Sequence, residues 1–486
     1  MEKILTGRQM LLCDRHTIDE VGIPSRELME RAARACCDIL ESSGFDLAHT
    51  AFVCGTGNNG GDGMAMAHIL HEKGKRVSVT LVGEPEKCSE ESAFRLGVLK
   101  NDGIEISPEI CTDGVSTVVD ALFGAGLSRP LTGKYKSAAE QINSSGIPVF
   151  SVDIPSGIFS DTGEVMGAAV RARACAAISN LKRGHVLYPG AEYCGRIYTA
   201  KIGISDAPVP DEEALFAIED GDLAPLCVRP PYTNKGSFGR VLVVGGCRGM
   251  AGAPYLSALA AYRSGAGLCE IFTPEDNRAI IQTLLPESVM TAYTDEDYES
   301  LLDASLGRAD AVVIGPGLGM SDISREIVRR TFGKCKAPLV CDADALNIAA
   351  AEELELPDCP TVITPHLGEM SRLTGKPIGE IQTSLVETAV SFARERGVVC
   401  LMKDARSIIS DGKRTFVNLS GTSAMAKGGS GDVLTGVVAA LLAYGLPPTD
   451  SAAFGAFIHG RAGERAAEKL GIHSLLARDI ADSIRR

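Results

Sequence analysis

The sequence lacks tryptophan, and none of its apolar runs is long enough to form a membrane helix. The longest candidate, residues 433–446, falls short of the ~18 residues that a span requires, and Thr435, Gly436 and Tyr444 interrupt it. The first residues, MEKILTGRQM, contain no basic segment followed by an apolar core, so we expect no signal peptide. These absences argue against a membrane-spanning or exported protein.

An excess of positive charge is also missing. The 62 acidic residues outnumber the 48 basic ones, and the formal net charge is −14. Nucleic-acid binding requires basic surface that neutralises phosphates, so we expect no nucleic-acid partner. Hydrophobic residues make up 45% and charged residues 23% of the 486 residues, which is an ordinary globular balance. At about 150 residues per domain, this length corresponds to roughly two to four domains.

The sequence also lacks a C-x-x-C motif, and its 15 cysteines are scattered along the chain. Several of them stand inside apolar runs, as Cys54, Cys269, Cys341 and Cys400 do. This distribution is typical of reduced, buried thiols in a cytoplasmic protein. We therefore expect a cytoplasmic location.

Glycine, by contrast, is abundant: the chain has 53 glycines, about 11% against a usual ~7%. Many follow apolar runs that alternate with helix-like segments such as 25–40 and 253–264. The strand-like runs are 51–54, 77–82, 117–120, 148–152, 196–200, 240–244, 268–273, 311–314, 338–341, 361–364 and 398–402. The alternation predicts parallel sheets with helices on both faces, and 406–410 with 414–417 predicts a hairpin.

One segment, 205–231, interrupts this alternation because it is rich in proline and acidic residues. We interpret it as a linker, with the domain boundary near residue 215. The prediction is an N-terminal domain over 1–215 and a C-terminal domain over 225–486. Each begins again with its own strand and Gly-rich loop, so we expect an α/β fold in both.

The first Gly-rich loop, CGTGNNGGDG, contains the spacing G-x-G-x-x-G, and Glu84 follows the next strand. This pattern fits a dinucleotide-binding dehydrogenase. However, Asn58 and Asn59 place amides where small residues would let the backbone approach a pyrophosphate. Asp62 places a carboxylate at the start of the helix, the position that would otherwise favour an anionic phosphate. The loop therefore suits a polar sugar or a monovalent cation as well as a phosphate.

Two aspartates end strands in this domain: Asp120 in VVDALFGAGL and Asp153 in VDIPSG. A third segment, NLKRGH, carries Lys182. In a parallel sheet the carboxyl ends of the strands open onto one crevice, which is the usual ligand site. Each aspartate alone could merely cap its turn. Two of them on different strands, each before a Gly-rich turn, favour a ligand site.

The combination of NNGGDG, DALFGAGL and VDIPSG resembles the N-terminal epimerase domain of bifunctional NAD(P)H-hydrate repair enzymes, over about residues 1–210. The resemblance implies a Rossmann-like three-layer αβα domain. It also implies that the hydrated nicotinamide nucleotide contacts Asn58, Asn59, Gly60, Gly61, Asp62, Gly124, Ala125, Gly126, Leu127, Ser128, Arg129, Pro130 and Asp153.

The same resemblance implies one potassium ion held by Asn59, Asp120 and Ser156. It implies that Asp153 is catalytic, with Lys182 as a second catalytic polar group. Oxygen atoms are the ligands that a hard cation prefers. A buried carboxylate can act as acid or base where a hemiaminal C–O bond breaks and forms.

The strongest motif of the C-terminal half is AMAKGGSGDVLTG. Its glycines free backbone N–H groups at the start of a helix, which makes an anion hole for a phosphoryl group. Asp432 stands beside that hole, where it can take a proton from an attacking hydroxyl. The alternative is a tight turn capped by this aspartate. Three further strand ends carry the loop GPGLG, His366 and Lys403. His366 alone could be an ordinary loop histidine.

This half resembles the ADP-dependent NAD(P)H-hydrate dehydratases, which have a ribokinase-like α/β fold, over about residues 225–486. The resemblance implies that the hydrate contacts Ala253, Gly317, His366 and Asp432, and that Asp432 is catalytic. It implies that ADP and AMP contact Lys403, Asp404, Ala405, Arg406, Ser407 and Gly431. Asp404 replaces the family's usual glycine and Lys427 a usual small residue, which bears on the choice between ADP and ATP.

Together the two resemblances imply a repair enzyme for NADHX and NADPHX. One domain interconverts the R and S epimers, and the other dehydrates the S epimer while ADP becomes AMP and phosphate. Phosphoryl transfer from a nucleotide also implies magnesium. We further expect a homo-oligomer with no membrane partner.

Two other functions fit parts of the sequence. A ribokinase-like small-molecule kinase fused to a binding domain would share the GGSGD motif, but it has no need of an epimerase-like half. An interaction scaffold associated with RNA would share the N-terminal fold. The polar residues Asn59, Asp62, Asp120 and Asp153 and the negative net charge argue against the scaffold.

Overall fold

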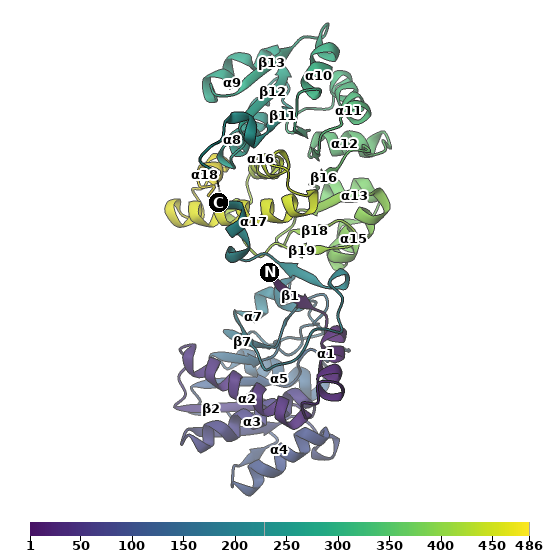
Figure 1. Ribbon diagram of the computed structural model, residues 1–486. Coiled ribbons are helices and arrows are strands. Elements are labelled where there is room, and N and C mark those ends of the chain that lie inside the picture. The colour runs from purple at the N-terminus through teal and green to yellow at the C-terminus, as the bar shows by residue number, and fades with distance from the viewer. Residues whose placement is uncertain (228, 486) are drawn as a thin grey trace. The chain divides into compact units, whose positions relative to one another are not determined.

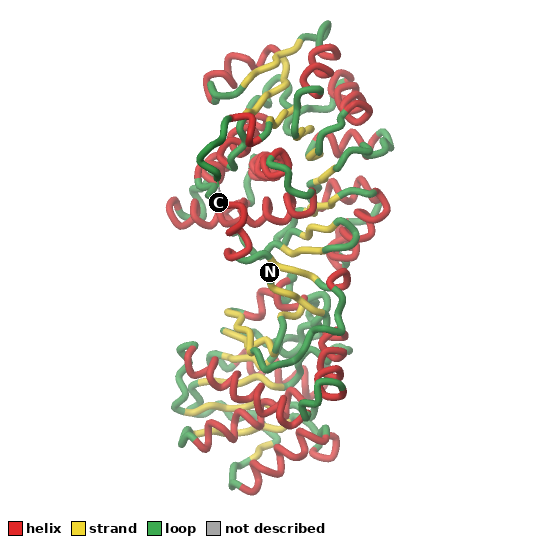
Figure 2. The backbone as a smooth tube through the Cα atoms, viewed as in Figure 1, coloured by secondary structure: helices red, strands yellow, loops and turns green. Residues whose placement is uncertain are grey.

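The computed structural model describes residues 1–227 and 229–485. The chain divides into two compact units, of which Lys3–Leu215 form the N-terminal one and the chain from Phe216 onward, with the first two residues, the C-terminal one. Each unit contains a parallel sheet with helices packed against it, which confirms the predicted two-domain α/β class (Figures 1 and 2). Within the described residues, no helix has the length and apolar character needed to span a membrane.

The N-terminal unit contains a seven-stranded sheet in which all neighbouring strands run parallel. Its order is β4 (Ile106–Ser107), β3 (Arg76–Leu81), β2 (His49–Cys54), β5 (Thr117–Ala121), β6 (Val149–Val152), β7 (Ala174–Ile178) and β9 (Arg196–Ala200). Strands β2, β5 and β6 are buried along their whole length because both faces of the sheet are covered.

Side chains alternate between the two faces of this sheet. Phe52 and Val119 lie in one apolar cluster with α2 (Ser25–Ser42), α3 (Asn58–Glu72) and α4 (Glu90–Asn101). Val53 and Val118 lie in a second cluster with α5 (Gly133–Ser144). The period of two that strand geometry imposes thus produces the predicted three-layer αβα arrangement.

A separate strand pair positions the first helix. β1 (Glu2–Leu5) runs parallel to β8 (Leu181–Lys182), with Leu5 opposite Lys182. Helix α1 (Gly7–Asp19) follows at once, and a capping box between Thr6 and Gln9 fixes its start. The pairing therefore brings the beginning of α1 next to Lys182. The short helices α6 (Arg183–Val186) and α7 (Ala191–Cys194) follow β8.

In the C-terminal unit the parallel strands are β13 (Val289–Tyr293), β12 (Leu268–Pro274), β11 (Arg240–Val244), β14 (Ala311–Ile314), β15 (Leu339–Cys341), β16 (Thr361–Ile363) and β17 (Val399–Met402), in that order across the sheet. The antiparallel pair β18 (Ile408–Ser410) and β19 (Thr415–Val417) follows, as the hairpin pattern predicts. β10 (Leu215–Ala217) lies at the junction of the units in the sequence.

Helix α16 (Ser430–Ala443) forms the centre of this unit's apolar core (Figure 1). Its residues from Val433 to Leu442 are all buried, because α8 (Gly252–Arg263), α17 (Pro448–Leu470) and α18 (Ala477–Asp482) pack around it. Gly436 allows close approach, since a side chain there would collide with the Ser257 carbonyl of α8.

The remaining helices of this unit connect or follow its strands. They are α9 (Arg278–Leu284), α10 (Tyr298–Leu306), α11 (Asp322–Lys334), α12 (Asp344–Ala351), α13 (Leu367–Thr374), α14 (Ile378–Thr383) and α15 (Leu385–Arg396). Helices α12 and α13 begin directly after β15 and β16. Their N-termini therefore stand at the carboxyl edge of the sheet.

Candidate functional site

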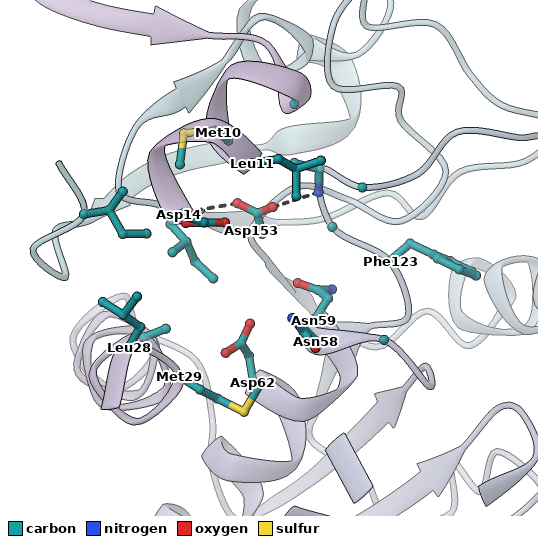
Figure 3. A pocket seen from close by; sticks show the side chains of 18 of the residues that line it. Met10, Leu11, Asp14, Leu28, Met29, Asn58, Asn59, Asp62, Phe123 and Asp153 are labelled. Carbon is teal, nitrogen blue, oxygen red and sulfur yellow. Dashed lines mark hydrogen bonds between the residues drawn. The ribbon is translucent and has the colours of Figure 1, made fainter. Parts of the chain in front are cut away.

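The carboxyl ends of β2, β5 and β6 lie side by side in the N-terminal unit and open onto a cavity of about 530 Å³ (Figure 3). The start of α3, the loop after β5 and the residue after β6 supply its polar wall, as the strand-end pattern predicts. Helices α1 and α2 supply an apolar wall that includes Met10, Leu28 and Met29. A partly polar, partly aromatic or aliphatic ligand fits such a lining.

Several predicted substrate residues line this cavity, and others do not. Those in the lining are Asn58, Asn59, Asp62, Gly124, Ala125, Gly126, Leu127 and Asp153. Lys182, predicted as a second catalytic group, also lines the cavity. The lining does not include Gly60, Gly61, Ser128, Arg129 or Pro130. Gly60 and Gly61 instead permit close packing, because a side chain at Gly60 would meet the Gly55 carbonyl and one at Gly61 would meet Met29.

Asp153 and Lys182 form a buried ion pair in the polar wall. Lys182 Nζ donates to Asp153 Oδ1 at 2.5 Å, and the backbone N–H groups of Ala125 and Ile178 donate to Asp153 at 2.9 and 3.2 Å. Burial opposes ionisation of Asp153, but the charge and hydrogen bond of Lys182 outweigh it and lower its pKa. Asp153 also has a φ of 65°, which is strained for a residue other than glycine.

Two further carboxylates face the cavity, and neither forms an ion pair with another residue in the described part of the chain. Asp62 is only 9% exposed, and burial together with the charge of Asp153 raises its pKa well above the usual value. Asp14, on α1, lines the same cavity. Burial raises the pKa of Asp14 to about 6, against the lowering effect of Lys182 and with a further rise from Asp153. Asp14 was not predicted from the sequence, although it stands on the apolar side of a helix, where a carboxylate is unusual.

Of the predicted potassium ligands, Asn59 lines the cavity, whereas Asp120 and Ser156 are not part of its lining. Asp120 is fully buried and accepts hydrogen bonds from Ser156 Oγ at 2.6 Å, from the Ser156 backbone at 2.9 Å and from Ser151 Oγ at 2.8 Å. A Cβ at Gly124 would lie 2.9 Å from Asn59 Oδ1 and 2.8 Å from Asp153 Oδ2, so Asn59 stands near Gly124 and Asp153. Asn59 Nδ2 is buried and has no partner among the described residues.

In the C-terminal unit, the carboxyl ends of β15 and β17 hold a second lysine–aspartate pair. Lys403 Nζ donates to Asp342 Oδ1 at 2.7 Å, and Asp342 is only 2% exposed. Burial would lower the pKa of Lys403, but Asp342 and Glu369 raise it above the usual value. Asp342 was not predicted from the sequence, although it follows a strand of the parallel sheet, as Asp153 does.

Asp432 stands in the first turn of α16 beside this pair. A Cβ on the neighbouring Gly431 would lie 3.4 Å from Lys403 Nζ and 3.7 Å from Asp342 Oδ2. Burial and the charge of Asp342 raise the pKa of Asp432 to about 7, although Lys403 lowers it. The structure thus brings Lys403, Gly431 and Asp432 together with Asp342.

His366 caps α13 through its side chain. Its Nδ1 accepts hydrogen bonds from the backbone of Gly368 at 2.9 Å and of Glu369 at 3.3 Å, so the proton of the ring is on Nε2, 3.4 Å from Glu369 Oε1. A backbone bridge joins His366 to Lys403, which places it beside the cluster. The capping role and a ligand role are compatible, because 54% of the side chain is exposed.

The other predicted contacts of this unit fall into two places. Ala253, at the start of α8, and Gly317, after β14, adjoin each other: a Cβ on Gly317 would lie 3.0 Å from that of Ala253. Asp404, Ala405, Arg406 and Ser407 form the loop between β17 and β18, in which Asp404 and Ala405 are exposed. The loop therefore continues from Lys403 toward the hairpin, outside the buried pair.

Comparisons with known proteins agree with both halves. Residues 241–486 match the NAD(P)H-hydrate dehydratase family, and residues 25–184 match the YjeF-related protein N-terminus family. The bifunctional NAD(P)H-hydrate repair enzyme of Thermofilum pendens is 37% identical, over 96% of this chain and 93% of that protein. The one from Moorella thermoacetica is 34% identical, over 99% of this chain and 95% of that protein.

A solved structure supports the fold of the C-terminal unit. A ribokinase-like superfamily protein from Enterococcus faecalis V583 is similar with a TM-score of 0.51 at 28% identity, over 55% of this chain and 93% of that chain. Both relatives named above exceed 30% identity over nearly the whole sequence. The chain therefore belongs to the family of bifunctional NAD(P)H-hydrate repair enzymes.

Proposed function

We propose that this protein repairs hydrated NADH and NADPH with two separate active sites. The N-terminal unit interconverts the R and S epimers of the hydrate, and the C-terminal unit dehydrates the S epimer while ADP becomes AMP and phosphate. The observation that carries the proposal is the presence, in one chain of this family, of two carboxylate–lysine clusters, each at the carboxyl edge of its own sheet.

In the N-terminal unit, the nucleotide contacts Asn58, Asn59, Asp62 and the loop 124–127, which line the cavity. It also contacts the adjoining residues Gly60, Gly61 and 128–130, which are not part of that lining. Asp153 stands at the reacting carbon, where it assists the breaking and forming of the hemiaminal C–O bond. Lys182 holds Asp153 in its ionised form through the 2.5 Å hydrogen bond. An ionised carboxylate at this place also stabilises the positive charge that develops when hydroxide leaves the ring.

Asn59, Asp120 and Ser156 form the potassium site of this proposal. The fit rests on charge: Asp120 is buried, and its partners among the described residues are hydroxyl and amide groups, none of which carries a positive charge. Burial raises the pKa of Asp120 above its usual value, which a cation beside it would reverse. The ion would supply a fixed positive charge behind the loop that contacts the nucleotide.

In the C-terminal unit, Asp432 takes the proton from the hydroxyl of the hydrate, and the oxygen attacks the terminal phosphoryl group of ADP, which releases AMP. Phosphate then leaves with the electron pair of the C–O bond, and loss of a proton from the neighbouring ring carbon restores NADH or NADPH. The backbone N–H groups at the start of α16 face the transferring phosphoryl group. Ala253, Gly317 and His366 contact the hydrate.

Lys403, the loop 404–407 and Gly431 contact the adenine nucleotide in this proposal, and magnesium accompanies its phosphates. Magnesium is usually held by one or two carboxylates together with phosphate oxygens, so no preformed cage is needed. Lys427 donates from Nζ to the His473 carbonyl at 2.7 Å, which fixes this lysine at the edge of the Gly-rich turn. Lys427 and Asp404 are the positions from which we expect an influence on the choice between ADP and ATP.

We propose a cytoplasmic enzyme, since the cysteines in the described part of the chain are free and most are buried. The function is tested by incubating the protein with a mixture of R and S NADH hydrate and ADP and following the absorbance of NADH. We expect full recovery of NADH and one AMP per NADH. Formation of a stable phosphorylated product without NADH would instead support the small-molecule kinase, and no reaction would reject both.

A further inference from the structure

Helix α1 forms one wall of the N-terminal cavity with a single face. Its cavity-lining residues are Gly7, Met10, Leu11, Asp14, Arg15 and Ile18, which follow the three- and four-residue spacing of one helical side. Met10, Leu11 and Ile18 are apolar, and Asp14 is the carboxylate among them. Figure 3 shows the Asp14 side chain turned toward the cavity near Asp153.

The surroundings of Asp14 and Asp153 differ in hydrogen bonding. Asp153 accepts from Lys182 Nζ and from two backbone N–H groups, so its oxygen atoms are engaged and its charge is compensated. The carboxyl group of Asp14 has no hydrogen bond and no ion pair within residues 1–227 and 229–485, and it stands in an apolar wall. An apolar site favours the protonated form of a carboxyl group, whereas an ion pair favours the ionised form.

Epimerisation of a hemiaminal needs a proton donor, because hydroxide leaves a ring carbon far more easily as water. Asp153, ionised and saturated with donors, holds no proton to give. We propose that Asp14 is a second acid–base residue of this cavity, which donates the proton to the departing hydroxyl of the hydrate. This inference rests on the epimerase function proposed above. That proposal names Asp153 as the ionised carboxylate, and the inference adds Asp14 as the group that donates the proton.

Epimerisation then consists of loss of water from the ring carbon and its return to the opposite face. The carboxyl proton of Asp14 passes to the hydroxyl oxygen, the C–O bond breaks with its electron pair on oxygen, and water leaves. The lone pair of the ring nitrogen forms the N=C double bond. Water then adds to the planar carbon, the double-bond electrons return to nitrogen, and Asp153 takes the surplus proton. Asp153 then releases this proton to solvent and Asp14 takes one up from solvent, which restores the starting state. Addition to the opposite face has produced the other epimer.

Two carboxyl groups whose pKa values are moved apart by their surroundings form a common acid–base arrangement. Burial raises the pKa of Asp14 to about 6, and the ion pair lowers that of Asp153. The charged groups that face Asp14 are Lys182 on β8, Asp153 after β6 and Asp62 on α3, with Arg15 beside it on α1. Because the acid acts in its protonated form, enzymatic epimerisation should fall as the pH rises through about 6.

The test compares Asp14→Asn with Asp19→Asn, an exposed aspartate at the end of the same helix. Epimerisation of purified S hydrate is followed by chiral separation at several pH values, with the spontaneous rate subtracted. Asp14→Asn should lower the rate by about 100-fold or more and remove the fall above about pH 6. Asp19→Asn should match the wild type. Dehydration of the S epimer with ADP, measured on the same samples, verifies that each variant is folded.

Each outcome decides between the possibilities. If Asp14→Asn keeps a rate within about threefold of the wild type and the same pH profile, the inference is wrong and Asp62 is the next candidate acid. Asp14→Glu keeps a carboxyl group, so we expect it to restore both the pH limb and part of the rate, which a purely structural role would not produce. If the wild-type protein itself does not epimerise the hydrate, the proposed function fails, not the assignment of Asp14 alone.

Discussion

The two units use the same pair of side chains in different ways. In the N-terminal unit the lysine is paired with Asp153, the carboxylate that we place at the reacting carbon, at 2.5 Å. In the C-terminal unit the lysine is paired with Asp342, at 2.7 Å, and the reacting carboxylate, Asp432, stands beside the pair and forms no ion pair with any described residue. The lysine is therefore paired with the reacting carboxylate in one unit and with a neighbour of the reacting carboxylate in the other.

This difference matches the chemistry that each site is proposed to perform. The pKa of Asp153 is lowered, so it stays ionised where positive charge develops on the ring. The pKa of Asp432 is raised to about 7, which suits a base that must take a proton near neutral pH and later release it. Both clusters include a strained backbone: φ is 65° at Asp153 and 49° at Ala343, next to Asp342.

The largest expected effect separates the two sites completely. Asp432→Asn should lower dehydration by about 10²- to 10⁴-fold, because it removes the general base. Epimerisation of the hydrate should continue at the wild-type rate. The readouts are NADH absorbance with ADP and chiral separation of the hydrate. Asp322→Asn, in the exposed first turn of α11, is the matched control and should retain both activities. Normal turnover of the Asp432 variant would reject this assignment.

The reciprocal change addresses the N-terminal site. Asp153→Ala should lower epimerisation by at least about 100-fold and leave the dehydratase acting on the S epimer alone. With a mixture of both epimers, NADH recovery should then stop near the amount of S epimer, apart from slow spontaneous interconversion. Chiral separation of the residual hydrate measures this directly, and Asp113→Ala at an exposed position is the control. Residual hydrate that still equilibrates at the wild-type rate would mean that Asp153 only caps its turn.

A smaller effect concerns the nucleotide. Lys403→Ala removes the ammonium group beside Gly431, so AMP binding should weaken by about 10- to 100-fold, the usual range for a charged hydrogen bond. Binding of the hydrate should change less. Calorimetric titration with AMP gives the dissociation constant, and Lys413→Ala in the β18–β19 turn is an exposed control. An unchanged constant would show that Lys403 serves Asp342 and not the nucleotide.

The smallest expected effect is the pH dependence of the two activities in the wild-type protein, which distinguishes the sites without any substitution. Asp432 acts as a base, so kcat/KM of dehydration should rise with pH through about 7, because the ionised fraction rises. Between about pH 8 and about pH 6 the loss should approach tenfold. Epimerisation, if Asp14 is its acid, should change in the opposite direction. If both activities changed in the same direction with pH, the proposed difference between the base Asp432 and the acid Asp14 would be wrong.

The sequence predicted much of each sheet, because strands buried on both faces are continuous apolar runs. The strands β9, β11 and β14 coincide with their predicted ranges. The strands β4, β7 and β13 were not predicted. β7, ACAAI, is rich in alanine and reads as helix, β4 has only two residues, and β13 is a partly exposed edge strand. Composition misleads where tertiary pairing, not local propensity, makes the strand.

The sites were predicted less evenly. Residues that follow strands, such as Asp153 and Lys403, were found because the carboxyl edge of a parallel sheet is a general ligand site. Asp14 was not found, because it reaches its cavity only through the pairing of β1 with β8, two short strands far apart in sequence. His366 has a second role, the cap of α13, which depends on its rotamer and not on its neighbours in sequence.

The most direct test of two independent sites in one chain is complementation between variants. Asp153→Ala and Asp432→Asn are each incubated with racemic NADH hydrate and ADP, alone and mixed, and NADH is followed to completion. We predict almost no NADH with Asp432→Asn, recovery limited to the S epimer with Asp153→Ala, and full recovery with the mixture, because the hydrate diffuses between the sites. A mixture that recovers no more NADH than Asp153→Ala alone would contradict the account.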